Sequence, residues 1–114
     1  MDLTGKCKKA FEVWYISNYC GDAGCLINIH SFNSLPLEFQ YGVYVDFFLS
    51  KSIRVYINDN IQSHAFSSTR EERLAKTRFG YEVDYDNYGS FRYNTIAEVR
   101  IAAIKKANEI YNSK

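Results

Sequence analysis

The segment that decides the fold is LPLEFQYGVYVDFFLSKSIRVYI, residues 35–57. It begins like a helix, because Ser34 suits an N-cap and the following proline suits a first helical turn, where its missing N–H has no cost. Four apolar side chains then share one helical face: Leu35, Phe39, Val43 and Phe47. We therefore predict a helix over about 36–50, in spite of its β-branched valines. Gly42 inside this helix is expected to be costly unless a neighbouring element packs close to it.

The end of the same segment changes its period and predicts a strand. Residues 51–59 place Arg54 and Tyr56 on an outward face, between three inward aliphatic side chains: Ile53, Val55 and Ile57. Asp59 and the asparagine after it then signal a turn. A helix followed directly by a strand indicates a mixed α and β architecture.

An earlier amphipathic helix is expected over residues 4–18, with Thr4 as its cap. Its apolar side chains recur at helical spacing: Cys7, Ala10, Phe11 and Trp14. The glycine-rich stretch after it, residues 19–24, predicts a loop. Residues 67–77 combine dense charge with few apolar side chains, so we expect them to lie outside the core.

A β-hairpin is predicted over TRFGYEVDYDNYGSFRYN, residues 77–94, because apolar and polar side chains alternate along it. We expect a three-residue loop over residues 87–89, with Gly89 in the left-handed conformation. This loop sets three cross-strand pairs: Val83 with Tyr93, Asp84 with Arg92, and Tyr85 with Phe91.

The last helix is predicted over residues 95–112, beginning at a capping box formed by Thr95 and Glu98. One stripe of this helix is apolar: Ile96, Val99, Ala103, Ala107 and Ile110. We therefore predict that residues 1–114 form a single α+β domain. It has two N-terminal helices, a small antiparallel sheet of about three strands, and a C-terminal helix packed on the sheet.

Composition narrows the classes of function. The chain has 114 residues, of which 17% are aromatic, and a formal net charge of +1. Rings at this density exceed what a small core needs, so several tyrosines are expected at the surface. The balanced charge gives no global field toward DNA or an anionic membrane, and no apolar run is long enough to span one, so no membrane partner is expected. Three cysteines and no signal-peptide pattern favour the cytoplasm.

Three stretches carry a resemblance to known proteins: LTGKCKKAFEVWY (3–15), LPLEFQYGVYVDFF (35–48) and AAIKKANEIYN (102–112). They resemble short, uncharacterised phage and prophage proteins. That family has no known activity, so the resemblance implies a setting and no chemistry. It implies a small protein in the host cytoplasm, of a kind that often binds and blocks host machinery such as a defence system.

Two sets of residues resemble chemical motifs, one a zinc site and the other a nuclease. Cys7, Cys20, Cys25 and His30 supply four possible zinc ligands, but their spacing is not that of a paired zinc knuckle, and Cys7 belongs to a core-facing stripe. GVY at 42–44 and YIN at 56–58 resemble the GIY-YIG nuclease motifs, with Tyr44 as the tyrosine, but the closing glycine is Asn58. We therefore expect no enzyme activity, no metal and no cofactor, and a metal-dependent nuclease of the GIY-YIG kind is kept as a remote alternative.

The order helix, three strands, helix over residues 36–112 resembles the double-stranded-RNA-binding fold, and this leaves a nucleic-acid-binding module as the alternative function. The lysines wanted at the start of the last helix are missing, since this sequence has Glu98 there. Arg70 and Arg73 offer phosphate contacts, but Glu71 and Glu72 lie between them.

The leading hypothesis is a non-catalytic binding protein that uses tyrosine and arginine side chains as contacts, because these residues concentrate binding energy. Its partner is expected to be a host protein or a nucleotide signal held between rings and arginines, and a homodimer is a further option. The predicted contact residues are Tyr41, Tyr44, Arg54, Tyr56, Arg70, Arg73, Tyr88 and Arg92.

Overall fold

The structure is a computed structural model of the whole chain, and it describes residues 1–20, 32–59, 69, 71 and 77–114. In these ranges the chain forms helices, a short π-helical turn and three strands. In order they are α1 (Gly5–Tyr15), the π-helical turn (Ile16–Cys20), α3 (Leu37–Ser50), β1 (Val55–Asp59), β2 (Phe79–Val83), β3 (Asp86–Tyr93) and α5 (Ile96–Ser113).

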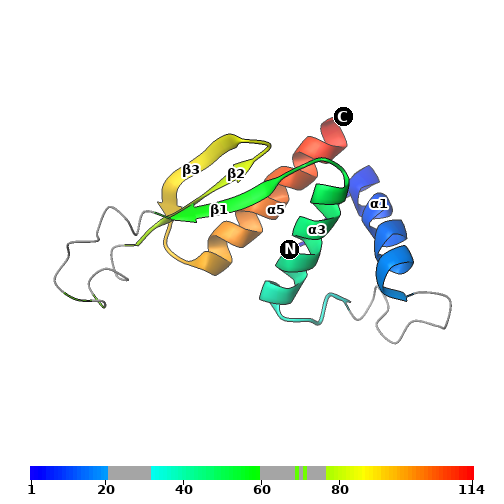
Figure 1. Cartoon of the computed structure of the whole chain (residues 1–114), viewed down its shortest axis with the longest axis horizontal. Coiled ribbons are helices and arrows are strands. Elements are labelled where there is room, and N and C mark those ends of the chain that lie inside the picture. Colours follow the sequence, from blue (N-terminus) through cyan, green and yellow to red (C-terminus); the bar gives the residue numbers. More distant parts are fainter. Residues whose placement is uncertain (21–31, 60–68, 70, 72–76) are drawn as a thin grey trace.

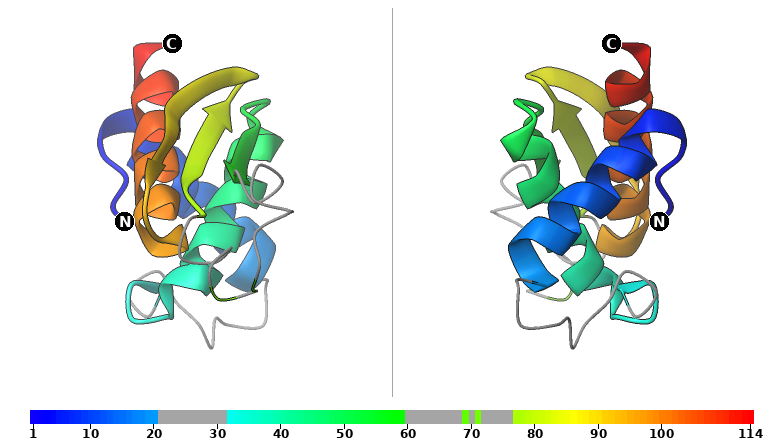
Figure 2. Two further views of the ribbon diagram at one scale, coloured as in Figure 1. Left: turned by 90° about the vertical axis from the view of Figure 1, so that its left-hand side faces the viewer. Right: turned by 90° about the vertical axis from the view of Figure 1, so that its right-hand side faces the viewer.

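The three strands form one antiparallel sheet in the order β1-β2-β3. Helix α5 lies along one face of this sheet, and α3 lies beside α5 (Figure 1). Helix α1 packs against α5 and α3 (Figures 1 and 2). The predicted fold class, including the C-terminal helix packed on a small sheet, is therefore confirmed.

The helices meet around a cluster of aromatic rings. Phe47 of α3 is fully buried, and its ring centre lies 5.3 Å from that of Phe11 and 5.5 Å from that of Trp14. The cluster includes further buried rings: Tyr15, Phe32, Tyr44 and Phe48. Edge-to-face and tilted ring pairs at these distances add stabilisation beyond the buried area. Most of the ring content of the helices thus serves the core.

The start of α1 is held by side chains of α5. The Thr4 N–H donates to Asn108 Oδ1 at 2.9 Å, and the Cys7 N–H donates to Asn112 Oδ1 at 2.9 Å. Thr4 occupies the predicted N-cap position, but its side chain makes no cap to α1. Its Oγ1 instead accepts from Asn108 Nδ2 at 3.0 Å. The first-turn donors of α1 are therefore capped from a segment about 100 residues away, which local sequence does not reveal.

The predicted hairpin turn was wrong. The strands are joined at Asp84 and Tyr85, whose φ angles are 53° and 71°, and Val83 pairs directly with Asp86. Two successive positive φ angles define the two-residue turn that matches strand twist. Asp84 suits it because its carboxylate accepts from the Arg54 N–H at 3.1 Å and its own N–H donates to the Arg54 carbonyl at 2.9 Å. The predicted pairs Val83–Tyr93, Asp84–Arg92 and Tyr85–Phe91 consequently do not form.

The predicted loop residues form an irregularity within β3 instead. Tyr81 pairs with Tyr88 and Phe79 pairs with Tyr93, so three extra residues bulge out of β3 between these pairs. Gly89 has a φ of 79°, and a Cβ there would lie 2.6 Å from Tyr93 Cε2. Across the ladder, a Cβ on Gly80 would lie 3.0 Å from the Phe91 nitrogen. The two glycines make room for the bulge.

The remaining predicted helices and strand are largely confirmed. The Thr95 hydroxyl accepts from the Glu98 N–H at 3.2 Å and caps α5, while Val99, Ala103 and Ala107 face the core. Ile53 and Val55 are buried, and Arg54 and Tyr56 face outward as predicted. Phe39 was placed on the core face of α3, but its side chain is 52% exposed. None of the described helices combines the length and the apolar character that a membrane span requires.

Burial of ionisable side chains predicts a loss of stability in alkali. Burial raises the pKa of Tyr81 from 10.0 to about 12 and that of the Cys7 thiol from 9.0 to about 12. Because the folded state holds these protons more tightly than the unfolded chain, the stabilisation they give is present at neutral pH and is lost as the pH rises from about 9 to 12. Urea midpoints are expected to fall across this window, and a midpoint unchanged between pH 8 and 11 would contradict this.

A groove between α3 and β1

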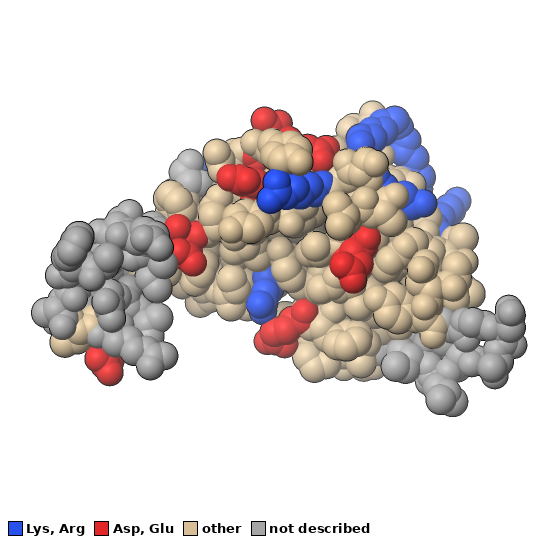
Figure 3. All heavy atoms as spheres, viewed as in Figure 1, with Lys and Arg blue, Asp and Glu red and all other residues tan. Residues whose placement is uncertain are grey.

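The described residues form an open groove of about 640 Å³ between α3 and β1. Its lining is mostly apolar or aromatic and comes from α3, β1 and the turn after α1. The lining residues are Tyr19, Glu38, Phe39, Tyr41, Gly42, Val43, Val45, Asp46, Val55, Tyr56 and Ile57. Figure 3 shows the surface hollowed in this region, with acidic side chains beside it. The α3–β1 groove is the candidate functional site.

The α3 wall of the groove is exposed and lacks one side chain. Phe39 is 52% exposed, which is unusual for a large ring on a helix whose other face is buried. Gly42 lies one turn further along, and apart from its chain neighbours and the backbone of its own helix, no atom of the described residues lies within 4 Å of the position that its Cβ would take. A mid-helix glycine costs about 1 kcal/mol relative to alanine. Among the described residues no neighbouring element packs close to Gly42, so close packing does not offset the cost of this glycine.

Arg54, which directly precedes β1, lies beside the groove between two exposed rings. The guanidinium carbon of Arg54 lies 5.6 Å from the ring centre of Tyr56 and 5.1 Å from that of Tyr85. The Tyr56 side chain is 50% exposed and that of Tyr85 is 73% exposed. Cation–π contacts hold flexible side chains in place, so less side-chain entropy is lost when a partner binds them. Arg54 and Tyr56 thus lie together, as a contact surface requires.

Tyr41 connects the groove to α5. Its ring is half-buried, and the Arg100 guanidinium carbon lies 5.4 Å from the ring centre. Burial raises the pKa of Tyr41 to about 12, and the nearby Arg100 charge offsets part of that rise. Tyr41 therefore stays neutral at physiological pH and can donate a hydrogen bond from the groove wall.

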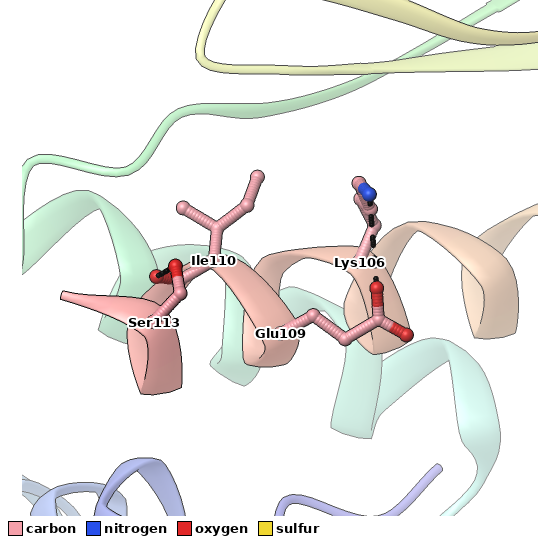
Figure 4. Close-up of polar contacts among 4 residues, drawn as sticks. All are labelled: Lys106, Glu109, Ile110 and Ser113. Carbon is pink, nitrogen blue, oxygen red and sulfur yellow. Dashed lines mark hydrogen bonds and ion pairs between the residues drawn. The ribbon is translucent and has the colours of Figure 1, made fainter.

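A second hollow lies between α5 and β3, on another part of the surface, and it contains Tyr88. The Tyr88 ring stacks on Tyr81 with centres 5.4 Å apart, and Lys106 Nζ lies 4.9 Å from the Tyr88 ring centre. Lys106 also pairs with Glu109 at 3.7 Å (Figure 4). Because Glu98 and Glu109 both line this hollow, its lysines do not form an uncompensated anion site.

The other predicted contact residues do not join the groove. Tyr44 is 3% exposed, and its hydroxyl donates to the Met1 carbonyl at 3.2 Å, so it is a core residue. Arg92 is exposed on β3. Arg70 and Arg73 lie outside the described residues. The eight predicted contacts therefore divide into three at or beside the groove (Tyr41, Arg54, Tyr56), one in the second hollow (Tyr88), one in the core, one on β3 and two that lie outside the described residues.

The described residues bear on the metal, nuclease and RNA-binding alternatives as follows. They hold no cluster of three or more side chains able to bind a metal ion. The nuclease-like GVY triplet lies within α3 and contains the buried Tyr44. Cys7 is buried, while Cys25 and His30 of the considered zinc set lie outside the described residues. Glu98 stands in the first turn of α5, where the RNA-binding alternative needs lysines.

Comparison with known proteins adds no relative: no family model matches the chain, and no curated protein or solved structure shows significant similarity to it.

Sequence reasoning missed Phe39, Tyr85 and Tyr19 as groove and surface residues. Phe39 was placed on the apolar face of α3 because its spacing matched that stripe. Tyr85 was paired with Phe91 inside the hairpin because the turn was placed three residues too late. Tyr19 carried no periodic signal. Gly42 could have indicated the groove. A glycine in the middle of a helix lowers helix stability, so its presence points to a packing or functional reason at that position.

Proposed function

We propose that the chain is a small non-catalytic binding protein that engages a protein partner through the α3–β1 groove. The observation that carries this proposal is the groove itself, with Phe39 and Tyr56 exposed on its two walls and an unfilled space at Gly42. Exposed rings beside an arginine are the side chains that concentrate binding energy at protein interfaces. The resemblance of residues 35–48 to phage proteins supports a partner from the bacterial cell, such as a defence component.

A protein partner fits the groove better than a nucleotide does. The charged residues that line the groove are Glu38 and Asp46, with one arginine, Arg54, beside it, so the two carboxylates outnumber the single cation and disfavour phosphate. The second hollow has lysines, but Glu98 and Glu109 line it as well. An apolar lining with few polar groups is typical of sites that bury side chains of another protein.

Photo-crosslinking tests this proposal. A benzoylphenylalanine at position 39 is expected to give discrete covalent adducts with one protein in bacterial lysate, identified by mass spectrometry. The matched control places the same group at Val13, which is 68% exposed on α1 and lies outside the groove. The control is expected to give no discrete adduct.

A blocking variant makes the test specific to the groove. Gly42→Phe puts a ring into the unfilled space and improves helix propensity, so the fold is expected to be at least as stable as the parent. The position-39 adduct is expected to fall at least tenfold in this background. Equal crosslinking from positions 39 and 13, or an adduct that Gly42→Phe leaves unchanged, would show that the groove is not the binding site.

A further inference from the structure

Strand β1 is an edge of the sheet, and the α3–β1 groove runs beside that edge. In the described part of the chain β1 pairs with β2 alone. Val55, Tyr56 and Ile57 of β1 line the groove. An edge strand carries unpaired N–H and C=O groups, which form a template for another strand. Folded proteins usually cover or charge such an edge, but here it opens into an apolar groove.

The pairing pattern identifies the unpaired groups. The Asp84 N–H donates to the Arg54 carbonyl, so Arg54 and Asp84 form a hydrogen-bonding pair across β1 and β2. In an antiparallel ladder such pairs alternate with pairs that exchange no hydrogen bond. The main chain of Tyr56 therefore forms hydrogen bonds with that of Glu82 in β2. The register pairs Val55–Val83 and Ile57–Tyr81 exchange no hydrogen bonds. The N–H and C=O groups of Val55 and Ile57 consequently point away from β2, toward the groove side.

The opposite wall suits an extended chain. Phe39 and Val45 present apolar surface across from β1, and Gly42 leaves the wall open between them. A chain lying along β1 forms main-chain hydrogen bonds on one side and places alternate side chains against α3. A helix laid in the groove bonds its own N–H and C=O groups internally and leaves the edge groups of Val55 and Ile57 without protein partners.

We propose that the α3–β1 groove binds an extended segment of the partner as a fourth strand, paired to β1 through the main-chain groups of Val55 and Ile57. This deepens the proposed function and rests on it. The segment has apolar side chains at alternate positions. The exposed carboxylates of Glu38 and Asp46 on the α3 wall favour Lys or Arg beside them.

The probe is a display library of linear twelve-residue peptides, selected on the full chain and counter-selected on Gly42→Phe. The selected peptides are expected to show apolar residues at every second position. N-methylation of alternate peptide nitrogens is expected to weaken binding at least tenfold, with the intervening positions tolerant, because only every second N–H faces β1.

Hydrogen exchange reads the same contact on the protein. In the free chain the Val55 and Ile57 amides are expected to exchange faster than the Tyr56 amide, which β2 protects. A bound peptide is expected to slow Val55 and Ile57 at least tenfold and to leave Tyr56 unchanged. A bound peptide that leaves Val55 and Ile57 fast overturns the proposal.

A matched pair of variants isolates the backbone contribution. Ile57→Pro removes the edge N–H and keeps an apolar side chain, at a position where proline removes no ladder bond to β2. Ile57→Val keeps the N–H. Peptide affinity is expected to fall at least tenfold for Ile57→Pro and less than threefold for Ile57→Val, with both variants folded by circular dichroism. Equal affinities for the two variants contradict strand addition.

The outcomes separate this inference from the proposed function. If position 39 crosslinks a protein but selected peptides show helical spacing, or if no peptide binds, the groove binds its partner without strand addition and the inference fails alone. If position 39 gives no specific adduct and no peptide binds, both fail. If sedimentation shows that the chain is a dimer, and Ile57→Pro makes it a monomer, then a second copy of the chain occupies this edge. That result overturns the proposal that a segment of another protein binds there.

Discussion

Phe47→Ala is expected to lower the free energy of unfolding by about 3–5 kcal/mol, the largest effect of any single substitution considered for this chain. The Phe47 side chain is fully buried where α1, α3 and α5 meet. Its ring centre lies within 6.0 Å of those of Phe11, Trp14, Phe48 and Tyr111. Removing the ring loses its transfer free energy. It also leaves a cavity between three helices, which can relax only partly to fill it.

Urea denaturation followed by far-UV circular dichroism measures this effect. A domain of this size has about 5–15 kcal/mol of stability, so Phe47→Ala is expected to be partly unfolded at 37 °C. Phe47→Leu keeps most of the volume and is expected to cost less than about 1.5 kcal/mol, which keeps the prediction measurable if the alanine variant does not fold.

The matched control is Phe39→Ala on the same helix. Its ring is 52% exposed, so its removal is expected to change stability by no more than about 0.5 kcal/mol. Comparable losses at positions 39 and 47 would show that the two rings are buried alike, and the groove wall would then not exist. The pair of variants therefore tests the core and the candidate site with one measurement.

Sequence reasoning succeeded where local patterns and the fold agree. The helix α5 could be predicted because its cap at Thr95 and its stripe of Val99, Ala103 and Ala107 lie within one continuous segment. The period change near residue 51 located both α3 and β1 for the same reason. The choice of helix for residues 36–50 was right because burial of Phe47 and Phe48 overrides the strand propensity of the valines between positions 42 and 46.

The failures come from contacts between distant segments. The hairpin turn at Asp84 depends on hydrogen bonds to Arg54, 30 residues away, so the nearer glycine at position 89 was a misleading local signal. The exposure of Phe39 depends on where β1 lies relative to α3, which helical spacing does not encode. The site residues Tyr41 and Tyr56 were named from their type alone, and only the packing of α3 beside β1 brings them to one groove.

Asn108→Ala is expected to lower the free energy of unfolding by about 1–3 kcal/mol, because it leaves the Thr4 N–H without its acceptor. Asn108 is 7% exposed, and its bond to the Thr4 N–H is partly buried. Asn112→Ala removes the acceptor of the Cys7 N–H in the first turn of α1, and the loss of such a cap costs about 1 kcal/mol. In both variants the N-terminal segment is expected to open locally more often than the sheet does.

Limited trypsin digestion measures this local effect, since trypsin cleaves after lysine and Lys6, Lys8 and Lys9 lie a few residues after Thr4. Cleavage there is expected to accelerate at least tenfold in Asn108→Ala, while cleavage within α5 follows global stability alone. Asn18→Ala is the control, because Asn18 is exposed and its Nδ2 donates to the Trp14 carbonyl one turn away. Thr4→Val combined with Asn108→Ala is expected to cost less than the two changes summed, because each removes the bond between Thr4 Oγ1 and Asn108 Nδ2. Strict additivity would mean that this contact does not hold α1 on α5.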